Sequence, residues 1–146
     1  MYKKILVPLD GSNRAEAILP HVEELAHNYS SEVILLQVIE PQYLFVDLHG
    51  LVIEDISLEA QQKQAKTYLS GLVEEFREKN IDAKSLTESG SIAHSIIRVA
   101  EREEVDLIAM ASHGRTGLAH VFYGSVAASV LNLVDRPLLL VRAEGS

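Results

Sequence analysis

The residues best suited to bind an anion lie between positions 111 and 125. Gly114 and Gly117 lack a side chain, so the backbone at these positions can approach a ligand closely. Gly124 and Ser125 begin a helical pattern, and the first N–H groups of a helix have no partner within it and favour negative charge. Hydroxyl groups add hydrogen-bond donors at Ser112, Thr116 and Ser125.

A phosphate bound in this segment would meet little positive charge from side chains. Arg115 is the only Lys or Arg between Arg102 and Arg136. Neutralisation would therefore rest mostly on backbone N–H groups, with or without a metal ion. From the residues alone, the pattern favours a phosphate site and an ordinary loop between a strand and a helix about equally.

Other kinds of site fit the sequence less well. A hydrolase triad of Asp10, His113 and Ser125 lacks the Gly-x-Ser-x-Gly elbow around its serine. The six histidines form no His-x-x-x-His pair and there is no cysteine, which disfavours a metal site built from protein ligands alone. Neither a Gly-Lys-Ser/Thr sequence nor a Gly-x-Gly-x-x-Gly after the first strand is present, so a P-loop and a classical dinucleotide site are disfavoured.

Five apolar runs alternate with four helical patterns along the chain. The predicted strands are residues 4–9, 32–39, 82–88, 106–111 and 137–141, and the predicted helices are about 15–29, 57–79, 92–103 and from 124 onward. Such alternation is typical of a single α/β domain, here 1–146, with a parallel sheet and right-handed crossovers. Asn13 and Glu16 predict a capping box for the first helix, and Leu131 belongs to the apolar stripe predicted for the last.

Ligands of open α/β sheets bind beyond the carboxyl ends of the strands, where the strand order reverses. Asp10-Gly11-Ser12 follows the first strand, Val38-Ile39-Glu40 ends the second, and the glycine-bearing segment follows the fourth. The polar run 82–88 predicts an edge strand.

Composition narrows the class of protein. The chain has 146 residues and a net charge of −8, which argues against general nucleic-acid binding because that requires Lys and Arg to displace counterions. No apolar run approaches the roughly 18 residues that span a bilayer, so no membrane insertion is predicted. The start of the chain shows no export signal, and a cytoplasmic location is expected.

One motif identifies a family. Ala111-Ser112-His113-Gly114, nine further residues and Gly124-Ser125 resemble the signature of the universal stress protein family, which is Gly, two residues, Gly, nine residues, Gly and Ser or Thr. Ile5-Leu6-Val7-Pro8-Leu9-Asp10-Gly11-Ser12 and Arg136-Pro137-Leu138-Leu139-Leu140-Val141 are similar to the opening and closing segments of that family. Ala111 stands where the family has its first glycine, and its methyl group could crowd a ligand.

This resemblance implies a doubly wound domain with strand order 3-2-1-4-5 and helices on both faces of the sheet. It implies ATP, ADP or AMP as ligand, with Mg²⁺ held through the phosphates. The residues that it places around the nucleotide are Pro8, Leu9, Asp10, Val38, Met110, Ala111, His113, Gly114, Gly124, Ser125, Val126 and Ala127.

Three functions remain open from the sequence. The first is a stress-response or regulatory protein whose nucleotide occupancy modulates a dimer or an unknown protein partner. The second is a dimeric interaction module that needs no nucleotide, and the third is a slow nucleotide hydrolase. An apolar edge strand at Leu138–Val141 predicts a homodimer, because such an edge invites pairing and the family commonly pairs there. The apolar segment 42–53 could cap the pocket, line an interface or pack onto the core.

Overall fold

A computed structural model describes residues 1–41, 57–113 and 124–143. In chain order its elements are β1 (Lys4–Leu9), the 3-10 helix η1 (Ala15–Ile18), α1 (Leu19–Tyr29), β2 (Glu32–Ile39), α2 (Ser57–Glu78), β3 (Asp82–Ser89), α3 (Ile92–Arg102), β4 (Leu107–His113), α4 (Gly124–Leu133) and β5 (Leu138–Ala143). The segment 42–53 lies outside the described residues, as do 114–123. None of the described helices is both long and apolar enough to cross a membrane.

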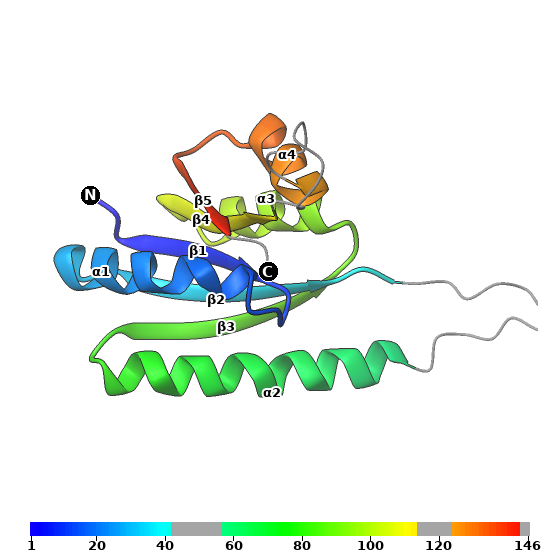
Figure 1. The fold of residues 1–146 in the computed structure, drawn as a ribbon, viewed down its shortest axis with the longest axis horizontal. Helices are drawn as coiled ribbons and strands as arrows, with labels where there is room; N and C mark the ends of the chain where they lie inside the picture. The colour runs from blue at the N-terminus through cyan, green and yellow to red at the C-terminus, as the bar shows by residue number, and fades with distance from the viewer. Residues whose placement is uncertain (42–56, 114–123, 144–146) are drawn as a thin grey trace, which may run out of the picture.

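The five strands form one parallel sheet in the order β3-β2-β1-β4-β5, which confirms the predicted fold (Figure 1). β3 lies at one edge, as its polar sequence predicts, and β5 lies at the other. Helices α1 and α2 cover one face of the sheet, and α3 and α4 cover the opposite face.

Both faces of β1 are buried because alternate residues enter two separate cores. Ile5 and Val7 pack with the buried residues of α1 and α2, while Leu6 packs with those of α3 and α4. Phe76 of α2 and Ile96 of α3 are among the fully buried side chains of the two cores. Continuous apolar strands such as β1 are what a sheet covered on both sides requires.

The first predicted helix is divided in two. A 3-10 turn precedes an α-helix that begins at Leu19, with Pro20 in its first turn. A proline has no N–H to donate to the carbonyl four residues earlier, so an unbroken α-helix across this position is disfavoured.

The predicted capping box of Asn13 and Glu16 is wrong. Ser12 caps this start instead, since its Oγ accepts a hydrogen bond from the N–H of Ala15 at 3.2 Å. The Glu16 side chain accepts a hydrogen bond from the Tyr68 hydroxyl of α2 at 2.6 Å. The signal was ambiguous because Ser12 and Asn13 are both good caps.

The last helix differs from its predicted stripe at one position. Leu131 is 48% exposed, although Ala127 and Val130 of the same helix are buried as predicted. Residue 131 follows residue 127 by one helical turn and lies on the same side of the helix, so helix periodicity does not explain its exposure.

The amino ends of β1 and β4 are held closely together. Asp106 Oδ2 accepts hydrogen bonds from the backbone N–H groups of Lys3 at 2.8 Å and Lys4 at 2.9 Å. The N–H of Asp106 in turn donates to the carbonyl of Lys4 at 2.9 Å. The central strand pair is therefore tightly joined at the end of the sheet opposite to the predicted site.

Candidate functional site

β1 and β4 separate before either strand ends. Their pairing stops at Leu6↔Ile108, whereas β1 stays paired with β2 as far as Leu9↔Gln37. β4 likewise stays paired with β5 as far as His113↔Ala143. The carboxyl ends of the two central strands therefore bound a crevice at the point where the strand order reverses, which is where ligands of such sheets bind.

Pro8 gives a local reason for this separation. The Lys3 carbonyl accepts a hydrogen bond from Glu32, before β2, and the Lys4 carbonyl accepts one from Asp106, before β4. The backbone N–H and C=O groups of successive strand residues point alternately to the two neighbouring strands. The backbone of Pro8 is therefore directed toward β4, as that of Lys4 is. Pro8 has no N–H, so β1 lacks a ladder donor on this side at this position.

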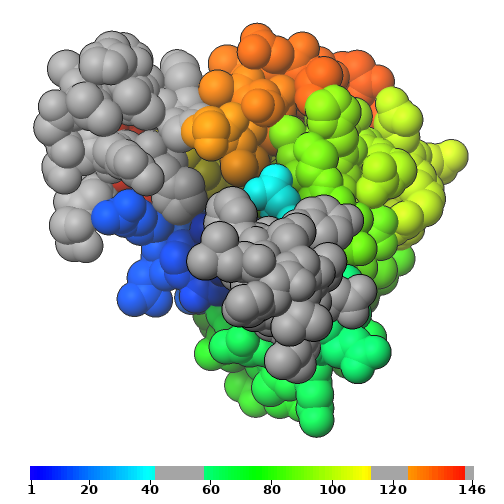
Figure 2. Space-filling model, turned by 90° about the vertical axis from the view of Figure 1, so that its right-hand side faces the viewer, coloured from blue at the N-terminus to red at the C-terminus, as the bar shows by residue number. Residues whose placement is uncertain are grey.

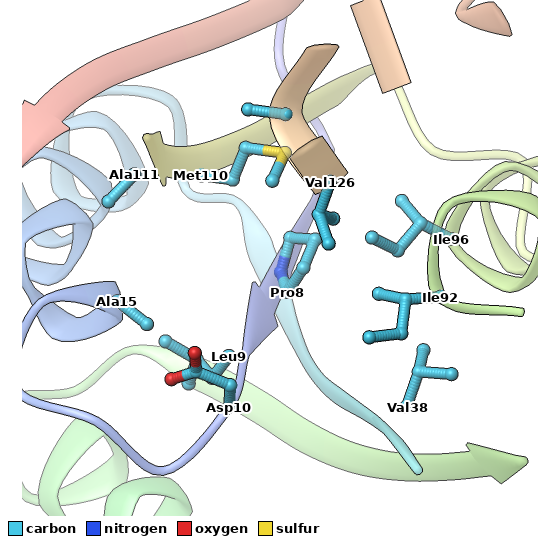
Figure 3. Close-up of a pocket in the computed structure, with 11 residues that line it drawn as sticks. Pro8, Leu9, Asp10, Ala15, Val38, Ile92, Ile96, Met110, Ala111 and Val126 are labelled. Carbon is cyan, nitrogen blue, oxygen red and sulfur yellow. The ribbon is translucent and has the colours of Figure 1, made fainter. Parts of the chain in front are cut away.

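A hollow of about 80 Å³ occupies the crevice. Figure 3 shows Ile92, Ile96 and Val38 along one side of it, and Ala15 and Ala111 on the other. The complete described lining is Pro8, Leu9, Asp10, Ala15, Val38, Ile92, Ile96, Met110, Ala111, Val126 and Ala127. Aliphatic side chains form nearly all of this surface, and Asp10 is its only charged group among the described residues. An apolar hollow with few polar groups is typical of a site for a small organic ligand.

A tight turn holds Asp10 at the rim of the hollow. Asp10 Oδ1 accepts hydrogen bonds from the backbone N–H of Ser12 at 2.8 Å and from its hydroxyl at 2.5 Å. Gly11 adopts φ +86°, a conformation that side chains disfavour. The Asp-Gly-Ser sequence thus fixes the carboxylate and, through the Ser12 cap, also positions Ala15.

The start of α4 forms the opposite side of the rim. α4 begins at Gly124, Ser125 is exposed, and Val126 and Ala127 line the hollow. The first turn carries no acidic residue. The first N–H groups, which have no partner within the helix, and the positive end of the helix dipole therefore favour an anion beside the apolar hollow. Figure 2 looks onto this end of the sheet, where α4 (orange), α3 (yellow-green) and the end of β2 (cyan) come together.

The structure brings most of the predicted site residues to one place. Those that line the hollow are Pro8, Leu9, Asp10, Val38, Met110, Ala111, Val126 and Ala127. His113 is the last residue of β4 and Gly124 is the first of α4, so both lie at the ends of elements that border the hollow. Ser125 is not part of the lining, and Gly114 lies outside the described residues.

Sequence reasoning missed three lining residues, Ala15, Ile92 and Ile96. Ile92 and Ile96 are one helical turn apart at the start of α3, which follows the edge strand β3. Their spacing was a signal for an inward-facing pair. Nothing in the sequence showed that the first turn of α3 would border a crevice two strands away.

Ala111 packs among apolar neighbours at the site. It is 7% exposed and belongs to the same buried cluster as Leu9 and Ala15. Its methyl group therefore adds to the apolar wall of the hollow. No group of three acidic or histidine side chains that could hold a metal occurs in the described parts of the chain.

Known proteins resemble this chain over its whole length. The model of the universal stress protein family matches residues 1–142. The chain is 33% identical to universal stress protein MJ0577 of Methanocaldococcus jannaschii, with 100% of this chain and 98% of that protein covered. The solved structure of MJ0577 has a TM-score of 0.83 to this chain and covers 100% of it and 99% of its own length.

Two further solved structures share the fold. One is a universal stress protein in complex with cAMP, 16% identical, with a TM-score of 0.73 and 98% of each chain covered. The other is the universal stress protein from Archaeoglobus fulgidus in complex with dAMP, 20% identical, with a TM-score of 0.68 and 96% of this chain and 98% of that one covered. At these identities the likeness is one of fold alone.

Proposed function

This chain belongs to the universal stress protein family, and from that premise we propose that it is a regulatory protein that binds an adenine nucleotide, with ATP the foremost candidate, in the hollow between β1 and β4. The adenine base would occupy the apolar hollow, and the phosphates would lie at the start of α4. Occupancy of the site would then change how the protein interacts with a second copy or with a partner protein.

The observation that carries this proposal is the placement of two unlike surfaces side by side. Apolar groups such as Pro8, Met110 and Val126 suit the faces of a purine, while the first N–H groups of α4 suit a phosphate. The described lining contains no Lys or Arg, so the phosphates would depend on backbone N–H groups and on a cation. Magnesium would be held by the phosphates and water, in keeping with its coordination preferences.

The ligands of the two neighbours support the choice of base. cAMP and dAMP both carry adenine and a phosphate, and both occur with proteins of this fold. In this chain such a ligand would place its purine in the apolar hollow and its phosphate at the start of α4. Nucleotide-independent action remains the second candidate, and the test below separates it from the first.

Thermal unfolding of nucleotide-stripped protein tests the proposal directly. Magnesium-ATP at a hundred times its dissociation constant should stabilise the folded state by about 2.7 kcal/mol. For a chain of this size the unfolding temperature should rise by several degrees. GTP at the same concentration serves as the control for a general effect of magnesium triphosphates, and it should give a smaller rise.

ADP, AMP and cAMP should be measured in the same series, because the contribution of each phosphate can then be separated from that of the base. An unchanged unfolding temperature with every adenine nucleotide would contradict nucleotide binding. It would favour an interaction module that acts without a nucleotide.

We also propose that the protein forms a homodimer through β5. Among the described strands β5 pairs with β4 alone, and Leu138, Leu139, Leu140 and Val141 are all only partly buried. The Pro137 carbonyl accepts a hydrogen bond from Ile108 of β4, so alternate residues beginning with Leu138 direct their N–H groups outward. An apolar edge strand with outward-directed donors favours pairing with a second strand.

Arg142→Pro should therefore shift the monomer–dimer equilibrium toward the monomer severalfold in sedimentation velocity experiments. Arg142 is exposed and lies at an outward-facing position, so the change removes an N–H from the outer side of β5 and leaves the ladder with β4 intact. Arg142→Ala keeps that N–H and is the matched control. A dimer that dissociates equally in both variants would indicate an interface elsewhere.

A further inference from the structure

The connection between the edge strand β3 and helix α3 consists of two residues, Gly90 and Ser91. β3 pairs with β2 as far as Ile39↔Ser89, the last residues of the two strands. The N–H of Gly90 then donates to the carbonyl of Ile39 at 3.0 Å and extends this pairing by one residue. Each residue of a chain has only two soft dihedral angles, so a connection this short determines where α3 begins relative to the end of β2.

Gly90 adopts a backbone conformation that residues with a side chain rarely adopt. Its φ angle is +137°. A Cβ atom at this position would also lie 3.3 Å from Ser95 Oγ, which is a crowded contact. Ser95 has little room to move away, because it is fully buried and its Oγ accepts a hydrogen bond from Arg98 Nη2 at 3.1 Å. The observed form of the connection therefore requires glycine.

The first turn of α3 carries part of the wall of the hollow between β1 and β4. Ile92 is the first residue of α3, and Ile96 follows one turn later. Both line the hollow, and Figure 3 shows them on the same side as Val38, which comes from the end of β2. This side of the hollow is thus built from two elements that are joined by the hydrogen bond between Gly90 and Ile39.

The second half of α3 is anchored without this turn. Val99 and Ala100 are fully buried in the core that α3 and α4 form with the sheet. The carbonyl of Ala100 also accepts a hydrogen bond from the N–H of Val105 at 3.1 Å, just beyond the end of the helix. A change at Gly90 should therefore move the first turn of α3 and leave its second half in place.

We propose that Gly90 is a positioning residue of the nucleotide site. It holds the first turn of α3 against the end of β2, so that Ile92 and Ile96 form one wall of the hollow before a ligand arrives. A wall that is already in place lowers the cost of binding, because fewer side chains have to be ordered by the ligand. This inference rests on the proposed binding of an adenine nucleotide in the hollow.

Gly90→Ala should raise the dissociation constant for magnesium-ATP about tenfold. The added methyl group favours a relaxed turn in which Ile92 leaves the wall, and the nucleotide then binds only the fraction of molecules that regains the original turn. A fraction of about one-tenth corresponds to a tenfold weaker apparent affinity. AMP should be weakened by the same factor, because this wall would contact the base. Titration calorimetry on nucleotide-stripped protein measures both ligands.

Gly71→Ala and Val99→Ala are the matched controls. Among the described residues, a Cβ atom added at Gly71 of α2 would crowd no neighbour within 4 Å, so the same substitution causes no strain there. Val99→Ala leaves a cavity in the core beside α3 and should lower the unfolding temperature, as Gly90→Ala should. Val99 is absent from the described lining of the hollow. Both controls should keep the affinity of the parent protein, which separates a positioning role from a loss of stability.

Methyl NMR spectra of the ligand-free protein give a readout that needs no nucleotide. Gly90→Ala should shift the methyl resonances of Ile92 and Ile96. The resonances of Val22, which lies in the core on the opposite face of the sheet, should stay unchanged.

A double-mutant cycle with Ile92→Ala tests whether Gly90 acts through this wall. Ile92→Ala should itself weaken ATP and AMP equally. In its background Gly90→Ala should weaken binding by clearly less than about tenfold, because both changes affect the same wall. If Gly90→Ala did not unfold cooperatively, equal weakening of ATP and AMP by Ile92→Ala would still be required.

Unchanged affinity of Gly90→Ala, in a parent protein that binds magnesium-ATP, would overturn this inference and leave the proposed function intact. Absence of binding to the parent protein would overturn both. Fully additive effects of Gly90→Ala and Ile92→Ala would show that Gly90 does not act through the wall. Equal weakening by Val99→Ala would show that stability, and not position, determines the affinity.

Discussion

Ser125→Asp should raise the dissociation constant for magnesium-ATP about a hundredfold. Ser125 is exposed in the first turn of α4, where we place the phosphates. A negative charge about 6 Å from a phosphate costs about 2.8 kcal/mol at an effective dielectric constant of about 20, and this corresponds to about a hundredfold in affinity. Titration calorimetry on nucleotide-stripped protein would measure the change.

The fold should tolerate this substitution, because a carboxylate near a helix start is favourable. The variant should therefore unfold at or slightly above the temperature of the parent protein when no nucleotide is present. Asparagine has nearly the same shape as aspartate but carries no charge. Ser125→Asn should therefore change the affinity for magnesium-ATP less than about threefold. Equal affinities of the Asp and Asn variants would show that the phosphates do not lie at α4.

Phe76→Ala should lower the free energy of unfolding by about 3 to 5 kcal/mol, a cost typical of removing a buried aromatic ring. Phe76 is 1% exposed and lies in the core between α2 and the sheet, with Leu69 and Val73 on the same helix face. The backbone carbonyl of Phe76 also accepts hydrogen bonds from the N–H groups of Lys79 and Ile81, two residues that lie just beyond the end of α2. Urea denaturation would measure the loss.

Leu133→Ala is the control for Phe76→Ala. Leu133 is an apolar helical residue of similar kind, but it is 41% exposed, and its truncation should cost less than about 1 kcal/mol. If the two substitutions had equal effects, the packing of α2 against the sheet would not be a principal source of stability.

Much of the fold could be predicted from the sequence because local patterns determine it. The strand β2 and the start of α3 are found where periodicity and flanking residues placed them. The polar character of β3 correctly predicted an edge of the sheet. The split between η1 and α1 was missed, although Pro20 gave a signal for it, because the apolar spacing continued across the break.

The candidate site was predicted in part for a different reason. The family motif and the Asp-Gly-Ser turn led to Asp10, Met110 and Val126, and these line one hollow. Ile96 and Ala15 were missed because each looked like an ordinary core residue. A residue is assigned to a core or to a pocket only by what lies opposite it, and sequence spacing within a helix carries no such information.

The sequence by itself determined which segments form strands and helices, that the strands run parallel, and a helix start suited to an anion, whereas the strand order was an expectation from the family resemblance. Short-range physics suffices for these, since periodicity, turns and helix ends depend on residues close together in the chain. Only the tertiary structure showed that β1 and β4 part after Leu6, and that the start of α3, with Ile92 and Ile96, borders the hollow. These features arise from spacing between elements far apart in the chain, which is set when the two cores pack.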